Sequence, residues 1–485
     1  MNRRVRHAIV VGGGIGGLMS ALALSRRGID ATLFERDAAP AAEVTVENSL
    51  AWLRRGVPQA LHPHFFMGRL RALLEANYPD LIGALERAGA GEGAFEDYVH
   101  PLGRAHYSPR AGDRRLKSIN CRRTTFEMTV RDYARAAPGV RIVDGARAVR
   151  LVTEPAREAA PAIVTGVEVE QDGASATHSA DVVLDACGRF DKLSESLASA
   201  GVAMNVEQRD SSIWYFTRHY RLRPGCDYPA SYGVPGAMFP DFIVGALPAD
   251  NGAFTVTFQI YREDKTIAKA LRDPTHFQAM CLAVERIKPW VDPARAEPTS
   301  DVFGFGQMDS FWRRSVVAGK PTVLGFFCVG DSAVRSNPKF GRGCTWTTIA
   351  AHHLADLLAA DVSPEERIRR YERALWREFR ADWQTMRGID ASTEAQFEIA
   401  TGRRKAKLRE RVSMRFSAFL DEAMLTEPGV FREIWSGYHG FARMSAWTTK
   451  PGVWLRLARA ALERGAHRDA LAPLARRPTR AELAG

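Results

Sequence analysis

The feature that most constrains this chain is a glycine-rich turn near its start. Residues 8–11 (AIVV) form a short apolar run, and residues 12–17 (GGGIGG) follow at once. An apolar run of this length is typical of a buried parallel strand. In the pattern GxGxxG, Gly12 permits the tight turn, Gly14 lets the backbone approach a pyrophosphate, and Gly17 lets the next helix pack closely on the strand.

A second strand and an acidic residue complete this unit. Residues 31–34 (ATLF) lead to Glu35, which stands about 20 positions beyond the glycines, where a carboxylate accepts hydrogen bonds from ribose hydroxyls. Strand, glycines, helix, second strand and acid occur in the order of a Rossmann unit, which predicts a dinucleotide site rather than an ordinary turn. This unit alone fits NAD as well as FAD.

Size and charge set wider limits. A chain of 485 residues with 46% hydrophobic and 25% charged residues is typical of a globular enzyme of two domains with a helical extension. The net charge of +11 favours an anionic partner, and the arginines are read as scattered, which argues against nucleic acid.

The cysteines and the apolar runs exclude other classes. Six cysteines are widely spaced and form no metal-binding pattern, so we expect a reduced protein without a metal. No apolar run approaches the roughly 20 residues of a membrane-spanning helix, so we expect no transmembrane segment and a cytoplasmic protein.

A family resemblance begins where Glu35 is followed by Arg36. Residues 10–36 resemble the FAD-binding start of the single-component flavin monooxygenases typified by aromatic hydroxylases. The resemblance implies FAD, and it adds Arg36 to the expected cofactor-binding residues Gly12, Gly14, Gly17 and Glu35.

Two further segments resemble motifs of this family. Residues 121–127 (CRRTTFE) open an expected helix and resemble the element RxxLExxLR, in which the leading arginine, here Arg123, approaches the cofactor. The alternative is a surface helix with an Arg/Glu pair. Residues 185–189 (DACGR) resemble a turn near the cofactor diphosphate, with Cys187 as a small buried filler in place of the usual small residue.

The most specific segment lies near residue 331. An apolar strand leads to Asp331, whose carboxylate suits the ribityl hydroxyls of a flavin, and NAD has no ribityl chain. Pro338, Gly341 and Gly343 then form a turn that offers backbone N–H groups at a helix N-terminus to the flavin N1/C2-oxygen edge. The segment resembles the family element GD…NPxYGxG, with Phe340 in place of tyrosine. This part of the chain therefore favours FAD.

The expected fold is α/β, a Rossmann-type FAD-binding domain with a β-sheet substrate domain and a C-terminal helical lobe. Residues 214–222 and 254–261 are predicted strands of the substrate domain. The predicted boundaries are 1–71, 118–205 and 304–363 for the FAD-binding domain, 72–117 and 206–303 for the substrate domain, and 364–485 for the helical region.

Three residues are candidates on the substrate side. Residues 54–64 (RRGVPQALHPH) resemble a GVPQ…HxH loop in one branch of the family, and the resemblance covers residues 8–360, roughly three quarters of the chain. His62 and His64 are candidate catalytic bases, with a loop held by histidine hydrogen bonds as the alternative. Arg218 is a candidate for holding an anionic substrate, with a structural ion pair as the alternative.

The C-terminal region has a different character. From residue 364 the sequence is helical and rich in arginine, and residues 431–463 also carry several tryptophans. A basic amphipathic helix here would lie on a membrane or bind an acidic protein partner. The alternative is a helical lobe packed against the flavin domain with solvated arginines.

The resemblance implies an FAD-dependent monooxygenase that uses NADH or NADPH and oxygen to hydroxylate an electron-rich, aromatic or similar substrate through a flavin C4a-hydroperoxide. The substrate is a small molecule or a tethered group, and the oligomeric state stays open. Alternatives are an FAD-dependent dehydrogenase or reductase of a lipid-like or prenyl substrate, a flavin halogenase, and a non-catalytic FAD-containing partner-binding protein. The GWxWxIP segment of tryptophan-acting halogenases is absent from the sequence.

Overall fold

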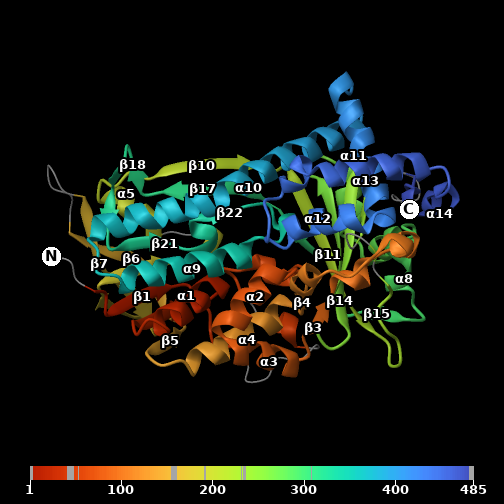
Figure 1. The fold of residues 1–485 in the computed structure, drawn as a ribbon. Helices are drawn as coiled ribbons and strands as arrows, with labels where there is room; N and C mark the ends of the chain where they lie inside the picture. Colours follow the sequence, from red (N-terminus) through yellow and green to blue (C-terminus); the bar gives the residue numbers. More distant parts are fainter. Residues whose placement is uncertain are drawn as a thin grey trace. The chain divides into compact units, whose positions relative to one another are not determined.

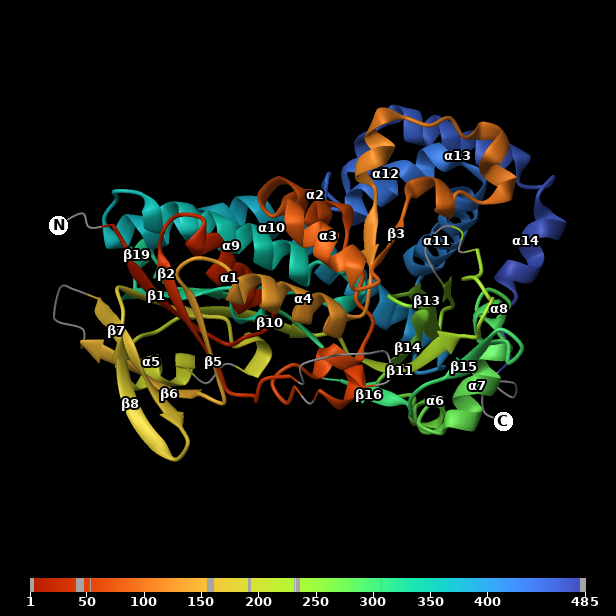
Figure 2. The same cartoon turned by 90° about the horizontal axis from the view of Figure 1, so that it is seen from below.

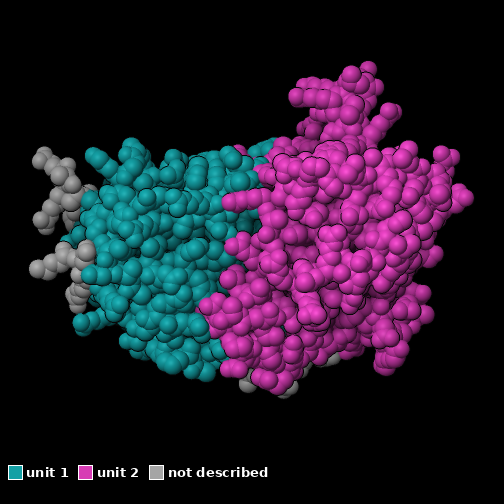
Figure 3. Space-filling view, viewed as in Figure 1, with its two compact units in different colours: residues 1–58, 124–209, 309–384 teal, residues 59–123, 210–308, 385–485 magenta. Residues whose placement is uncertain are grey.

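The computed structural model describes residues 4–40, 48–52, 54–154, 161–190, 193–230, 232, 236–306 and 308–479. The chain forms two compact units, coloured separately in Figure 3. Unit 1 comprises Met1–Pro58, Thr124–Arg209 and Asp309–Gln384, and unit 2 comprises Gln59–Arg123, Asp210–Met308 and Thr385–Gly485.

Unit 1 is built on a five-stranded parallel sheet in the order β21-β9-β1-β2-β5. Its strands are β1 (His7–Val11), β2 (Asp30–Glu35), β5 (Val140–Asp144), β9 (Val182–Asp185) and β21 (Phe326–Cys328). Helices α1 (Ile15–Ser25) and α9 (Gly343–Ala359) pack against each other beside β1 (Figure 1). The order is that of a Rossmann sheet, so the α/β fold and the strands expected at residues 8–11 and 31–34 are confirmed.

Smaller elements complete unit 1. They are α4 (Arg123–Arg135), α5 (Leu193–Ser199), a four-stranded sheet of β6 (Arg147–Glu154), β7 (Ala162–Gln171), β8 (Ala174–Ser179) and β20 (Val323–Leu324), a three-stranded sheet of β10 (Asn205–Asp210), β17 (Asp309–Arg314) and β22 (Val334–Arg335), and the pair β18 (Val316–Val317) and β19 (Lys320–Pro321). Figure 2 shows β6, β7 and β8 as one curved layer within this unit.

Unit 2 contains a six-stranded antiparallel sheet. Its strands are β11 (Ile213–Leu222), β12 (Ala237–Met238), β13 (Phe242–Pro248), β14 (Ala253–Tyr261), β15 (Ala296–Pro298) and β16 (Phe303–Phe305). Strands β11 and β14 confirm the two strands predicted from the sequence. Side chains alternate between the two faces, and one face buries Phe216, Tyr220 and Phe258 against α6 (Lys265–Ala270), α7 (Pro274–Leu282) and α8 (Lys288–Val291).

The rest of unit 2 is mostly helical. It comprises α2 (Gly68–Asn77), α3 (Pro79–Arg87), the strand pair β3 (Gly91–Gly93) and β4 (Ser118–Asn120), and α11 (Leu408–Thr426), α12 (Pro428–Tyr438), α13 (Pro451–Glu463) and α14 (Arg468–Ala475). Helix α10 (Pro364–Ala400) begins in unit 1 and ends in unit 2. No helix in the described part of the chain is both long and apolar enough to cross a membrane.

The C-terminal helices differ from the sequence-based expectation. Residues 431–463 do not form one amphipathic helix, because the chain turns at Gly440, where φ is +80°, and restarts at Pro451. Phe431, Trp435 and Leu457 are buried in a core that they share with residues 95–116 of the same unit. The predicted domain boundaries assign an FAD-binding or a substrate-binding role to the segments before the C-terminal helical region. These roles stay a prediction.

Candidate functional site

The glycine turn after β1 has the geometry that its sequence predicts. Gly12 has a φ of +104°, and a Cβ there would lie 2.6 Å from the Ala186 carbonyl oxygen. A Cβ on Gly17 would collide with the Gly12 carbonyl oxygen, so only glycine lets α1 begin so close to the turn. The N-cap of α1 is Gly14, which has no side chain to occupy the helix N–H groups. These groups suit an anion such as a diphosphate.

Segments far apart in sequence meet beside this turn, all within unit 1. A Cβ on Gly16 would lie 3.5 Å from the Thr347 Cγ2 on α9, and a Cβ on Gly330 would lie 2.9 Å from the Thr347 hydroxyl. The glycine turn therefore lies beside both the Asp331 segment and the first turns of α9. This is the carboxyl edge of the parallel sheet, where Rossmann folds bind dinucleotides.

Asp331 faces the N-terminus of α9. Its carboxylate oxygen lies 3.8 Å from the position that a Cβ would take on Gly343, the first residue of that helix. Within the described residues, no hydrogen bond is donated to this carboxylate, and only the Asp331 main-chain oxygen accepts one, from Arg335. The left-handed Gly341, with a φ of +62°, and the short turn that begins at Pro338 bring the chain back to α9. The Asp331 carboxylate therefore offers hydrogen-bond acceptors, and the N–H groups at the start of α9 offer donors, to a single ligand.

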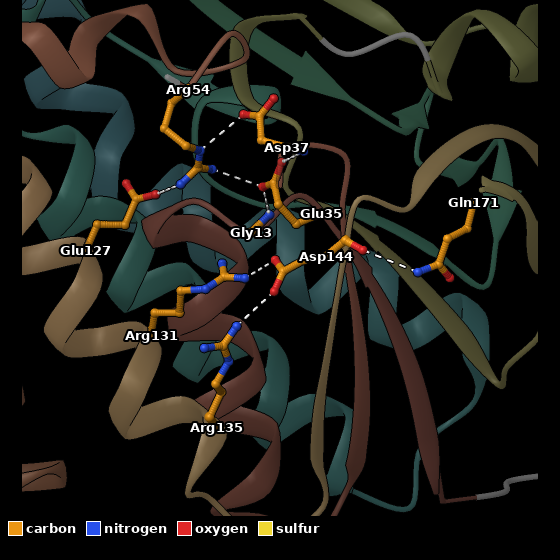
Figure 4. Close-up of polar contacts among 9 residues, drawn as sticks. All are labelled: Gly13, Glu35, Asp37, Arg54, Glu127, Arg131, Arg135, Asp144 and Gln171. Carbon is orange, nitrogen blue, oxygen red and sulfur yellow. Dashed lines mark hydrogen bonds and ion pairs between the residues drawn. The ribbon is translucent and has the colours of Figure 1, made fainter. Parts of the chain in front are cut away.

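Glu35 is tied to the glycine turn (Figure 4). Its Oε2 accepts hydrogen bonds from the Gly13 N–H at 2.6 Å and from the Arg54 Nη2 at 2.9 Å, and its Oε1 accepts one from the Asp37 N–H at 2.9 Å. A carboxylate has about four acceptor positions, so Glu35 retains room for a ribose hydroxyl.

Arg54 organises the acids around Glu35, a role that was not predicted from the sequence. Its side chain is 2% exposed and also pairs with Asp37 at 3.2 Å and with Glu127 on α4 (Figure 4). Burial alone lowers the pKa of Arg54, but Glu127, Glu35 and Asp37 together raise it above its ordinary value. The only sequence signal was an arginine within the GVPQ loop, and its three partners are distributed over the chain.

The expected cofactor residue Arg36 lies at the rim of this cluster. Its side chain is 44% exposed and stands 3.9 Å from Asp37. Its guanidinium lies over Gly56, where a Cβ would come within 2.6 Å of Nη2.

Helix α4 is not a surface helix. Phe126 and Val130 are fully buried, and Arg131 pairs with Asp144 at the end of β5. Glu127 pairs with Arg54, which lies outside this helix. The leading Arg123 donates from Nη1 to the His64 Nε2 at 3.0 Å.

The turn at residues 185–189 is held by its own acid. Asp185 is fully buried, and its Oδ1 accepts a hydrogen bond from the Cys187 N–H at 2.9 Å. Its main-chain oxygen accepts one from the Ser332 hydroxyl at 2.6 Å, which fastens this turn to the Asp331 segment. Burial lowers the pKa of Arg189, while Asp309 and Asp331 oppose that effect. These hydrogen bonds give residues 185–189 a structural role in this turn.

The second polar region lies in unit 2, on the sheet face opposite the apolar core. The His62 Nδ1 lies 2.7 Å from the Thr217 hydroxyl, which lies 2.7 Å from the Thr257 hydroxyl. His219 donates from Nε2 to the Leu61 carbonyl at 2.9 Å. The Phe305 ring stacks on His62 with centroids 5.1 Å apart. We call His62, Thr217 and Thr257 the polar row.

The imidazoles beside this face are neutral. Burial, with a smaller effect of His219, lowers the pKa of His62 to about 3, and burial followed by Arg123 lowers the pKa of His64 to about 3. Burial lowers the pKa of His219 to about 4. His64 donates from Nδ1 to the His62 carbonyl at 3.1 Å and accepts from Arg123 through Nε2, so both its nitrogens are engaged. Within the described residues, the Nε2 of His62 has no hydrogen-bond partner.

Arg218 does not join His62 and His64. It lies on the opposite face of β11, among the core residues, and its guanidinium donates to the carbonyls of Ser300 and Pro274 at 3.0 and 2.9 Å. The substrate-binding role considered for Arg218 finds no support in this geometry, and neither does an ion pair, because its partners are carbonyl oxygens. Alternation along a strand puts Arg218 and His219 on opposite faces of β11, but the sequence does not tell which face meets the core.

Comparison with known proteins agrees with the fold. Residues 7–287, more than half of the chain, match the family model described as FAD dependent oxidoreductase, and the chain belongs to this family. It is 28% identical over 368 residues to the protein Rv3254 of Mycobacterium tuberculosis, a match that covers 73% of each chain. It is 25% identical over 360 residues to the flavin-dependent halogenase gsfI of Penicillium aethiopicum, covering 72% of this chain and 61% of that protein.

A solved structure shows the same architecture. The p-nitrophenol 4-monooxygenase PnpA of Pseudomonas putida superposes with a TM-score of 0.58 at 16% identity, covering 90% of this chain and 98% of PnpA. At this identity the likeness shows a shared fold. The chain is therefore an FAD-dependent oxidoreductase, as expected from its motifs.

Proposed function

We propose that this protein is an FAD-dependent monooxygenase that uses NADH or NADPH and oxygen to hydroxylate a small, electron-rich aromatic substrate. The observation that carries the proposal is the meeting of the glycine turn, the Asp331 carboxylate and the α9 N-terminus at one edge of the unit 1 sheet. A dinucleotide with a ribityl chain is the ligand that uses all three features.

The residues of unit 1 fit FAD. In the proposed complex the α1 N-terminus at Gly14 faces the diphosphate, and Glu35 accepts from the adenosine ribose. Asp331 accepts from the ribityl hydroxyls, and the N–H groups after Gly341 face the flavin ring edge. When bound, FAD supplies electron storage and oxygen activation, and the protein supplies position and dryness.

The polar row supports an aromatic substrate with an O–H or N–H group. In this proposal His62 accepts the substrate hydrogen bond through Nε2, while Nδ1 shares its proton with Thr217 and, through it, with Thr257. Because burial holds the pKa of His62 at about 3, the imidazole is neutral at near-neutral pH, and its Nε2 has a lone pair that can accept this hydrogen bond. Phe305 supplies apolar ring surface beside His62, and Phe303 does so beside His219.

Halogenation is the second candidate. The match to the halogenase gsfI at 25% identity favours it, and that match covers less than two thirds of the halogenase. The two activities share the flavin and oxygen, and they differ in whether oxygen or a halide is added to the aromatic carbon.

The test begins with purified protein and its flavin content. We expect bound FAD, NADH or NADPH oxidation stimulated by a phenol or an aromatic amine, and product that carries an atom from labelled molecular oxygen. Product that forms only with chloride or bromide assigns the halogenase. Turnover of a prenyl or lipid-like substrate without oxygen assigns the reductase. Purified protein that takes up no FAD contradicts the proposal.

Three variants test the proposed roles. His62→Gln should lower kcat/KM by about 100-fold or more, while His276→Gln on the exposed end of α7 should not. Arg218→Gln should leave KM unchanged, because its guanidinium lies on the core face. An increased KM for Arg218→Gln would restore the role predicted from the sequence.

A further inference from the structure

The first half of α11 projects from the rest of unit 2 (Figures 1 and 3). Leu408, Val412 and Phe416 on this part of the helix are 70%, 60% and 36% exposed. They are spaced four residues apart, so they form one stripe along the helix. Isolated exposed apolar residues are ordinary, but a continuous stripe on a projecting helix marks a binding surface.

Positive charge surrounds this stripe. Residues 403–415 contain seven Lys or Arg residues and a single acid, Glu410. At about 100° per residue, Arg411 and Arg415 lie along one side of the stripe and Arg409 along the other. This cluster differs from the expectation that the arginines are scattered along the chain.

The charges beside the stripe are not neutralised by the protein. The side chains of Arg409, Arg411 and Arg415 form no ion pair within the described residues. Glu410 is taken by Arg404, which binds both its oxygens at 2.9 and 3.0 Å. Three guanidinium groups are therefore available to an anionic partner.

The apolar surface continues onto α13. The Phe416 ring stacks on Trp454 with centroids 6.2 Å apart, and Trp454 is 46% exposed. Leu455 and Leu462 of α13 are 73% and 87% exposed. We define the α11 surface as Leu408, Val412, Phe416 and Trp454 with Arg409, Arg411 and Arg415.

We infer that the α11 surface binds the surface of a membrane that contains anionic lipids. An interfacial helix buries an apolar face among the acyl chains while its arginines contact lipid phosphates, and the α11 surface has both parts in this arrangement. A nucleic acid would use the charges but leave the apolar stripe in water. The inference is independent of the reaction proposed above, and it assigns a location to the enzyme rather than a substrate.

The experiment measures co-sedimentation of the full-length, FAD-loaded protein with lipid vesicles. One set contains phosphatidylcholine alone, and the other contains phosphatidylcholine with phosphatidylglycerol. We expect binding to the anionic vesicles, weakened by salt, and little binding to the neutral ones. Each neutralised Lys or Arg should weaken binding about fivefold, so R411E/R415E should weaken it by roughly 25-fold or more.

The apolar part is tested separately. L408S/V412S/F416S should abolish vesicle binding, while the matched control V206S/M238S, at side chains that are 46% and 52% exposed elsewhere, should bind like the parent protein. All variants must retain their FAD, which shows that they are folded. Because these positions are exposed, the substitutions leave the cores intact.

Three results overturn the inference. The first is equal sedimentation with neutral and anionic vesicles, or none with either. The second is a dimer in analytical ultracentrifugation that L408S/V412S/F416S dissociates, which would assign the surface to a second copy of the chain. The third is binding to polyglutamate as tight as to vesicles and unaffected by the apolar substitutions, which would assign it to an acidic protein.

Discussion

The two polar regions of this molecule are built on opposite electrostatic principles. At the sheet edge of unit 1, Arg54 is buried among three carboxylates, and the side chains of Arg54 and Glu127 are each 2% exposed. On the sheet face of unit 2, the buried groups are the neutral imidazole of His62 and the hydroxyls of Thr217 and Thr257.

The difference follows from what each region must do. Buried charges are costly unless they are completely paired, and a complete cluster holds each member in one place. Unit 1 needs that rigidity, because Glu35 positions the glycine turn through the Gly13 N–H. The polar row, which we propose contacts the substrate, instead needs groups that change hydrogen-bond partners without creating a buried charge, and neutral imidazole and hydroxyl groups meet that need.

The largest effect is expected from a steric change in the glycine turn of unit 1. Gly17→Ala should cost about 3 kcal/mol or more in the free energy of unfolding and abolish FAD binding, because the new Cβ meets the Gly12 carbonyl oxygen. Gly16→Ala is the matched control, since its Cβ would make an ordinary contact at 3.5 Å with Thr347. Chemical unfolding and flavin absorbance measure both. Equal stability and equal FAD binding of the two variants would contradict the close contact between α1 and the glycine turn.

The charged cluster is tested by removing the buried cation of Arg54. Arg54→Met should lower the free energy of unfolding by about 3–5 kcal/mol, because it removes the buried guanidinium that pairs with three carboxylates. Adding Glu127→Gln should recover part of the loss. Arg147→Met serves as control, since Arg147 and its partner Glu170 are 62% and 52% exposed, and it should change stability little. A mild effect of Arg54→Met would remove the contrast between the two regions.

The proposed ribityl contact predicts a smaller effect, confined to the cofactor. Asp331→Ala should weaken FAD binding about 10- to 100-fold, the effect of losing a hydrogen bond to a charged group. Asp361→Ala, at an exposed position after α9, should leave the affinity unchanged. Titration of apo-protein with FAD gives both dissociation constants. Unchanged FAD affinity in Asp331→Ala would separate Asp331 from the cofactor.

The neutral histidines predict a pH dependence. The folded pKa of His64 is about 3 against an ordinary value of 6.5, so below pH 6.5 the unfolded chain binds a proton that the folded chain does not. Each such histidine lowers stability by about 1.4 kcal/mol per pH unit as the pH falls from 6.5 toward the folded pKa. His64→Gln should therefore reduce this slope by that amount. Unfolding by urea across this range measures the slopes.

The local parts of the fold were predictable from the sequence. Strand β1, the turn with Gly12 and Gly17, and the helix after Gly343 are encoded by neighbouring residues, because apolar runs and glycines restrict the backbone where they stand. The family motifs extended this prediction to FAD. The same reasoning identified β11 and β14 by their alternating pattern.

Only the tertiary structure decided which side chains meet. Arg54 acquires its partners from β2, the turn after it and α4, and no spacing in the sequence brings those acids together. Arg218 and His219 are neighbours in β11, yet one faces the core and the other the polar face.

The helices of the C-terminal region give the same lesson. Trp435 on α12 is buried, whereas Leu408 on α11 is 70% exposed, although both lie in helices that carry apolar and basic residues. The sequence by itself determined the nucleotide-binding scaffold, because its glycines and apolar runs act on their own stretch of backbone. Long-range packing decided the charge cluster, the polar row and the exposed stripe, since burial depends on what the rest of the chain brings to each face.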